Sequence, residues 1–148
     1  MFFSKKKNKF RVVALLTCRN ESLYLERSLQ HLYEQGIETC FIDNESTDNS
    51  LEIAKRFKRK GVFMIEKQPF PGYFDLVEQL KIKERLISEI DSDWFIHHDV
   101  DEIREAPSPF INLKEGIFEA DKRGFNAINF DEFVFIPSSF DENYERKD

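Results

Sequence analysis

Hydrophobic and polar positions alternate along the chain in blocks that predict buried strands separated by helices. Short, mostly apolar runs occupy residues 10–17, 39–43, 62–66 and 93–98. Such runs are typical of strands that are covered on both faces of a parallel sheet. Between the first two runs, Leu25, Leu29 and Leu32 recur at the spacing of one helical face. Residues 21–35 are therefore predicted to form a helix that packs on the sheet and ends at Gly36, and Asn20 or Ser22 could cap its start.

The same alternation continues through the rest of the chain. A helix with Ile53, Ala54 and Phe57 on one side is predicted to stop near Gly61. The remaining predicted elements are a helix over residues 74–90, a short helix over 113–123 and a last strand over 126–136. Strands that alternate with helices predict an α/β fold, with a mostly parallel sheet flanked by helices and right-handed crossovers.

The composition is that of a globular protein of about one domain. The 148 residues are 41% hydrophobic, and 34% are charged residues spread along the chain, which suits a buried core and solvated helix faces. A net charge of −6 argues against nucleic acid as the main partner, because non-specific binding depends on Lys and Arg. No apolar run approaches the roughly 20 residues of a transmembrane segment.

The chain opens with a basic leader over residues 1–9, and residues 10–148 are expected to form a single domain. The leader has no following hydrophobic region of signal-peptide length, so we predict a cytoplasmic protein. The leader could make a weak contact with an anionic membrane surface. Cys18 and Cys40 are expected to stay reduced, because the end of the first strand and the start of the second lie at opposite edges of a parallel sheet, too far apart for a disulfide.

Polar side chains follow the first, second and fourth predicted strands. Because the carboxyl ends of parallel strands open on one edge, residues 17–21, 43–48 and 99–102 are expected to converge there. Asp99 and Asp101, one residue apart, could hold a hard divalent cation such as Mg²⁺ or Mn²⁺. These ions usually complete their coordination with substrate phosphates and water. The edge is therefore a candidate site for a phosphate-bearing substrate.

Three motifs at this edge resemble those of a known family. They read Leu-Thr-Cys-Arg-Asn-Glu over residues 16–21, Ile-Asp-Asn-Glu-Ser-Thr-Asp over 42–48 and Asp-Val-Asp over 99–101. In this order they resemble the nucleotide-sugar-binding half of family 2 glycosyltransferases, over about residues 10–105. The resemblance implies a Rossmann-like GT-A fold, a UDP- or GDP-linked sugar donor and a glycan or lipid-linked acceptor. It also implies that the chain is truncated on its C-terminal, acceptor side.

The resemblance assigns roles to residues of the first two motifs. It implies that Thr17, Arg19 and Glu21 line the base and ribose pocket, and that Asp43 accepts a hydrogen bond from the nucleobase. Glu45 departs from the pattern, because the family usually has glycine there. The departure could alter how closely the backbone approaches the base.

The third motif and its surroundings would hold the diphosphate and the metal. The resemblance implies that Asp99 lies near the ribose and the metal, that Asp101 binds a Mn²⁺ or Mg²⁺ ion bridging the diphosphate, and that Lys83 reaches the phosphates. Such an ion would stabilise negative charge on the leaving group. The general base is not identified; the late acidic candidates are Asp131, Glu132 and Asp141.

Several of these residues also have a purely structural explanation. Asp43 and Asp48 could cap a helix, and Lys83 could be a solvated helix lysine. His97 and His98 cannot both bind one ion, because neighbours on a strand point to opposite faces. We expect His97 to support the site from the Asp99 face and His98 to be packed.

Two other functions are compatible with the sequence. Residues 95–101 also resemble the first motif of haloacid-dehalogenase-type phosphohydrolases, although that motif normally opens its domain and only 47 residues follow Asp101 here. Alternatively, the chain could be a non-catalytic or incomplete module that binds a nucleotide sugar. Turnover of a sugar donor or of an aryl phosphate would distinguish these possibilities.

Overall fold

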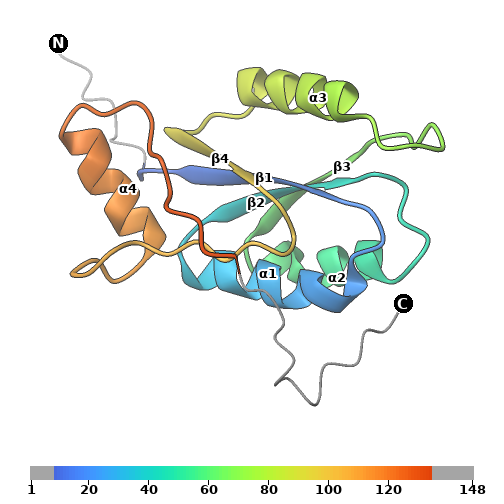
Figure 1. Ribbon diagram of the computed structural model, residues 1–148, viewed down its shortest axis with the longest axis horizontal. Helices are drawn as coiled ribbons and strands as arrows, with labels where there is room; N and C mark the ends of the chain where they lie inside the picture. The colour runs from blue at the N-terminus through green and yellow to red at the C-terminus, as the bar shows by residue number, and fades with distance from the viewer. Residues whose placement is uncertain (1–8, 135–148) are drawn as a thin grey trace, which may run out of the picture.

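A four-stranded, all-parallel sheet forms the centre of the protein, with helices on both faces (Figure 1). The computed structural model describes residues 9–134. The strands are β1 (Val12–Cys18), β2 (Glu38–Asp43), β3 (Val62–Lys67) and β4 (Trp94–His98), in the order β3-β2-β1-β4. The helices are α1 (Ser22–Glu34), α2 (Ser50–Arg56) with the 3₁₀ turn η1 (Phe57–Arg59), α3 (Leu76–Glu89) and α4 (Leu113–Lys122). The predicted α/β fold is confirmed.

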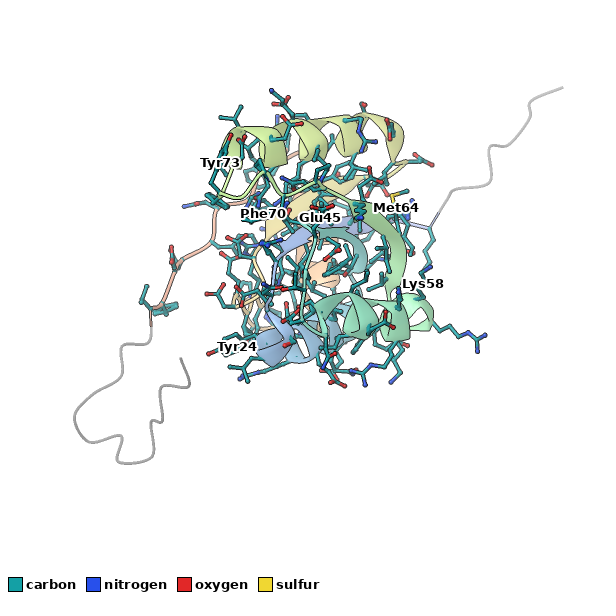
Figure 2. The ribbon with its side chains drawn as sticks, turned by 90° about the vertical axis from the view of Figure 1, so that its right-hand side faces the viewer. Tyr24, Glu45, Lys58, Met64, Phe70 and Tyr73 are labelled. Carbon is teal, nitrogen blue, oxygen red and sulfur yellow. The ribbon has the colours of Figure 1, made fainter. Side chains whose placement is uncertain are left out.

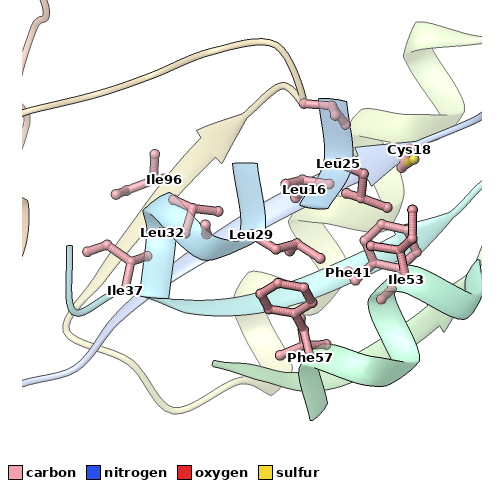
Figure 3. Close-up of a cluster of buried hydrophobic side chains, with 14 of the residues drawn as sticks. Leu16, Cys18, Leu25, Leu29, Leu32, Ile37, Phe41, Ile53, Phe57 and Ile96 are labelled. Carbon is pink, nitrogen blue, oxygen red and sulfur yellow. The ribbon is translucent and has the colours of Figure 1, made fainter. Parts of the chain in front are cut away.

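Each face of the sheet has its own apolar cluster, because successive side chains of a strand point to opposite sides. The larger cluster lies under α1, α2, η1 and α4 and includes Leu16, Leu29 and Phe41 (Figure 3). The smaller cluster joins Val13 and Leu15 of β1 to the C-terminal part of α3. The inner strands β1 and β2 are thus covered on both sides, as their apolar runs predicted, whereas β3 and β4 are partly exposed.

The register brings the strand ends together. Cys18, the last residue of β1, lies opposite Asp43, the last residue of β2. Leu16 lies opposite His98 at the end of β4. The loops that follow these three strands therefore start at one edge of the sheet, as predicted.

The two cysteines are free and buried, which confirms that they do not pair. Cys40 lies opposite Leu15 rather than at the far end of its strand. Cys18 and Cys40 belong to the clusters on opposite faces. Burial raises the pKa of Cys18 to about 11 and that of Cys40 to about 12, so both thiols stay protonated at neutral pH.

The strand predicted over residues 126–136 is absent from its described part, residues 126–134. Ile128 and Phe130 instead pack against the larger cluster, along a cleft of about 630 Å³ beside β4. Arg104 donates a hydrogen bond to the carbonyl oxygen of His97 in β4, which is an outer strand of the sheet. The apolar pattern is thus satisfied by side-chain packing without a β-ladder. Residues 135 and 136 lie outside the described residues, so the domain limit at residue 148 stays a prediction.

Helix α3 forms where it was predicted, but its apolar residues are largely exposed. Leu76, Val77, Leu80 and Ile87 are 43–63% exposed, whereas Lys83 is only 3% exposed. The sheet contacts come from Ile82 and Leu86. The spacing of apolar residues therefore predicted the helix without identifying its buried face. Among the helices of residues 9–134, none combines the length and apolar character needed to cross a bilayer.

Candidate functional site

The loops after β1 and β2 are joined by Asn20. Its Oδ1 accepts hydrogen bonds from the backbone N–H of Thr47 at 2.7 Å and of Asp48 at 3.4 Å. Its own N–H donates to Ser46 Oγ at 3.2 Å. Asn20 has a φ of 57°, in the left-handed region that asparagine tolerates better than most residues. Two motifs that start 26 residues apart are thereby held as one unit.

We expect Asn20→Ala to lower the free energy of unfolding by about 2 kcal/mol. Alanine loses the side-chain acceptor, worth about 1 kcal/mol, and is strained at positive φ by about 1–2 kcal/mol. Urea unfolding followed by circular dichroism measures the change. Asn20→Gly is the matched control, because it removes the acceptor but relieves the strain, and it should lose less. Equal losses of stability in the two variants would contradict the contribution of backbone strain at positive φ.

Asp48 is part of the same joint and caps two helices. Its Oδ2 accepts from the N–H of Ser22 at 3.0 Å, in the first turn of α1, and its Oδ1 accepts from the N–H of Ser50 at 2.9 Å. Burial alone would raise its pKa, but the hydrogen bonds from Ser50 and Ser22 outweigh it and lower the pKa to about 2. The capping explanation of Asp48 is confirmed. The cap of α1 thus comes from the second loop and not from Asn20 or Ser22.

Acid should remove the stabilisation that Asp48 provides. A carboxyl whose pKa is lower in the folded state stabilises the fold above its unfolded pKa and loses this effect as the pH falls through its folded pKa. The window lies between the ordinary value of 3.8 and about 2. Asp48→Asn should therefore have a lower Tm than the native protein near pH 6, and the difference should shrink from pH 4 to pH 2. A Tm difference that stays constant over this range would contradict the prediction.

Buried polar atoms at the same edge lack partners. Asp43 is 2% exposed and its Oδ1 accepts from the N–H of Ser46 at 3.2 Å. Thr17 Oγ1 and Gln68 Oε1 are buried, and neither has a hydrogen-bond partner among the described residues. Such atoms are rare in proteins because an unmade hydrogen bond is costly. Sequence reasoning missed Gln68, although a polar residue directly after β3 lies at the same edge and was a usable signal.

Arg19, Glu45 and Phe70 form a second link across this edge, and Figure 2 labels Glu45 and Phe70. Arg19 Nη1 donates to the carbonyl oxygens of Asn44 at 2.7 Å and Glu45 at 2.6 Å, and its guanidinium lies 3.4 Å from the ring centroid of Phe70. Glu45 Oε2 accepts from the N–H of Phe70 at 3.0 Å. This hydrogen bond is the main reason why the pKa of Glu45 is lowered. Sequence reasoning did not identify Phe70.

The unusual Glu45 has a backbone explanation. Its φ is 51°, the left-handed conformation in which glycine is favoured, so the family pattern of glycine at this position has a steric reason. In this chain the contact between the Glu45 side chain and Phe70 offsets part of that strain. The departure therefore changes the chemistry of the loop more than its path.

Carboxylates from three strand ends influence one another. Burial raises the pKa of Glu21, and the negative charges of Asp101 and Asp48 raise it further. Asp99 and Asp101 are both exposed to solvent. Within residues 9–134, no group of three or more His, Cys, Asp or Glu side chains is arranged to hold a metal ion. The site thus offers a cation two exposed carboxylates, those of Asp99 and Asp101. Glu21 lies close enough to Asp101 for their charges to interact.

A chain of polar groups leads from α3 to Asp99. Lys83 Nζ lies 3.1 Å from His97 Nδ1, and His97 Nε2 lies 3.5 Å from Asp99 Oδ1. His97 therefore lies on the Asp99 side of β4, as predicted. Burial lowers the pKa of Lys83, and the carboxylates of Asp99 and Glu102 oppose this shift.

His98 is fully buried, which confirms that it is packed. Its Nε2 lies 3.4 Å from Ser28 Oγ, and its Nδ1 lies 3.2 Å from Arg104 Nη1. Burial, followed by the positive charge of Arg104, lowers the pKa of His98 to about 4. His98 is therefore neutral at physiological pH and links α1 to β4.

Residues 14–71, which contain the first two motifs and both links between them, match the family model for glycosyl transferase family 2. The match covers less than half of the chain. The match ends before Lys83 and before the Asp-Val-Asp motif. No curated protein matches the chain in sequence. The matched segment includes the first two loops of the edge, which confirms the predicted resemblance of these loops to family 2 glycosyltransferases.

Solved glycosyltransferases share the fold. S. aureus TarS 1–349 superposes with a TM-score of 0.59 at 15% identity, over 83% of this chain and 39% of that chain. TarS 1–349 in complex with UDP-GlcNAc gives a TM-score of 0.54 at 16% identity, over 76% and 30%. Mannosyltransferase PcManGT from Pyrobaculum calidifontis, in complex with GDP-Man and Mn²⁺, gives 0.51 at 18% identity, over 68% and 30%. The GT-A fold is therefore confirmed, and the chain spans less than two fifths of each of these solved chains.

Proposed function

We propose that the carboxyl edge of the sheet binds a nucleotide-diphosphate sugar, UDP- or GDP-linked, and supports transfer of the sugar to an acceptor hydroxyl of a glycan or lipid-linked molecule. The observation that carries the proposal is the joining of the two loops of the family 2 match through Asn20, at the sheet edge where β4 leads into Asp99 and Asp101. One edge thereby offers groups for a base and groups for a diphosphate.

The base and ribose would lie against the first two loops. Thr17 Oγ1 is a buried polar atom in need of a partner, and Asp43 would accept from the nucleobase. Arg19 and Glu21 would line the pocket, with the Arg19 guanidinium already fixed by two carbonyl oxygens. A rigid, preorganised pocket lowers the entropic cost of binding.

The diphosphate would lie toward β4. The exposed oxygens of Asp99 and Asp101 are hard ligands and fit Mg²⁺ or Mn²⁺, with phosphate oxygens and water completing the coordination. When bound, such an ion supplies Lewis-acid stabilisation of the leaving diphosphate. Lys83 would add positive charge from α3, and the two aspartates would hold the diphosphate end of the donor in place.

The late acidic residues are the candidates for the general base on the acceptor side. Asp131 and Glu132 are exposed, and Asp141 lies outside the described residues. Because the chain spans 20–39% of the solved glycosyltransferase chains, a donor-binding module that needs further chain for transfer is the second candidate. The phosphohydrolase alternative lacks support. Its motif normally opens the domain, whereas Asp99 follows β4, the fourth strand along the chain and an outer strand of the sheet.

Isothermal titration calorimetry with UDP, GDP and their sugar conjugates, with and without Mn²⁺, tests the proposal. Binding of one nucleotide class that strengthens with Mn²⁺ is expected. Absence of binding to every member of the panel would overturn the proposal. Binding without donor hydrolysis or transfer would favour the donor-binding module.

A further inference from the structure

Lys83 is buried, which is unusual for a lysine in a small α/β protein. It is 3% exposed, and within residues 9–134 no carboxylate oxygen lies within 4.0 Å of its ammonium group. Burying a charge without a direct partner is unfavourable. Its hydrogen-bond contact is His97 Nδ1, 3.1 Å away. An apolar side chain at position 83 would pack without burying a charge. The burial of a lysine there therefore needs an explanation other than packing.

The chemistry of this contact determines the state of the His97 ring. A lysine ammonium has three donors and no acceptor. His97 Nδ1 must therefore accept, which leaves the ring proton on Nε2. Nε2 lies 3.5 Å from Asp99 Oδ1, so its N–H is next to the Asp99 carboxylate.

The backbone around His97 is held as well. The side chain of Arg104 donates to the carbonyl oxygen of His97, and it also forms an ion pair with Glu102 at 2.7 Å. Glu102 Oε2 in turn accepts from the N–H of Asp99 at 3.1 Å. The main chain at Asp99 is thereby fixed by the Arg104 pair, and the side chain of Asp99 faces the ring of His97.

We infer that Lys83 and His97 are positioning residues for Asp99: Lys83 holds His97 in the Nε2–H tautomer, and His97 Nε2–H orients the Asp99 carboxylate. The inference rests on the proposed function, because orienting Asp99 matters only if that carboxylate contacts the metal or the donor. Partners of this kind, one shell behind a ligand, typically change metal affinity 10–100-fold. Lys83 thus acts on the site through His97 from a buried position.

The tautomer can be measured without any ligand. The chain contains only 3 histidines, so two-bond ¹H–¹⁵N spectra of the ¹⁵N-labelled protein should resolve each ring, with His97 assigned by its absence in His97→Gln. The native protein should show His97 with Nδ1 unprotonated, and Lys83→Met should show a mixture of tautomers. Protonated Nδ1 in the native protein, or an unchanged tautomer in Lys83→Met, would overturn the inference.

Titration with UDP or GDP and Mn²⁺ tests the effect on the site. Lys83→Met and His97→Phe should each weaken Mn²⁺-dependent binding by about 10-fold, and the double variant should be no weaker than either single variant. His97→Gln should retain most of the affinity, because an amide keeps one acceptor and one donor. Lys81→Met, an exposed lysine on the same helix, is the control and should bind as the native protein does.

The outcomes separate the two proposals. If the native protein binds no nucleotide, the proposed function fails while the tautomer measurement still decides the role of Lys83. If the native protein binds and both variants bind equally well, the positioning role is wrong and the proposed function stands. Circular dichroism of each variant checks that it is folded, and His97→Phe replaces Lys83→Met if the latter is not.

Discussion

Asp101→Asn is expected to abolish the strengthening of nucleotide binding by Mn²⁺, with a loss of at least about 100-fold in affinity. Asp101 is exposed after β4, and an amide oxygen is a far weaker ligand for a hard cation than a carboxylate. The effect should exceed that of any partner behind the site, because Asp101 is proposed to contact the metal itself. Calorimetric titration at saturating Mn²⁺ measures it.

The matched control is Asp91→Asn, which removes an exposed carboxylate just before β4, at the opposite edge of the sheet. It carries the same change in net charge, so a general electrostatic effect on an anionic nucleotide would appear in both variants. Affinity should be unchanged in Asp91→Asn. If Asp101→Asn binds as tightly as the native protein in the presence of Mn²⁺, Asp101 is not a metal ligand.

Phe41→Ala is expected to lower the free energy of unfolding by about 4 kcal/mol. Phe41 is fully buried in β2, an inner strand of the sheet, within the cluster that also contains Ile53 and Phe57 (Figure 3). Truncation removes apolar burial and leaves a cavity that the surrounding strands and helices cannot fill. Urea unfolding at neutral pH measures the loss, which is a large part of the stability of a small domain.

Phe133→Ala supplies the comparison for this prediction. Phe133 is 80% exposed, so its truncation should change the free energy of unfolding by no more than about 0.5 kcal/mol. The pair separates burial from residue type, since both substitutions are chemically identical. Similar losses in the two variants would mean that the described core does not determine stability.

Lys83 illustrates which parts of the site were predictable. Its place before the Asp-Val-Asp strand pointed to a basic residue near the phosphates, and its helix was predicted from apolar spacing. Its burial was not predictable, because α3 turns Lys83 and Leu86 toward the sheet while Leu76 and Val77 remain exposed. Spacing reports that a helix has a face, whereas the rotation of the helix about its axis is decided by what it packs against.

Capping gives a second example. A local rule assigned the cap of α1 to Asn20 or Ser22, yet the acceptor is Asp48, from a loop 26 residues further along the chain. Local capping rules consider only neighbours in sequence, and here a distant carboxylate had the better geometry. Asn20 used its side chain instead to bind the second loop. The first loop binds the second through Asn20, and the second loop caps α1 through Asp48. The two loops therefore form one structural unit.

The sequence by itself determined the order of strands and helices, the parallel sheet and the edge where the motifs meet, because these follow from hydrophobic periodicity and chain direction. Only the tertiary structure decided the side-chain partners. The unpartnered Thr17 and Gln68, the contact of Arg19 with Phe70 and the path from Lys83 through His97 to Asp99 all join distant segments. Such contacts depend on distances of a few ångströms between elements, and periodicity carries no information at that scale.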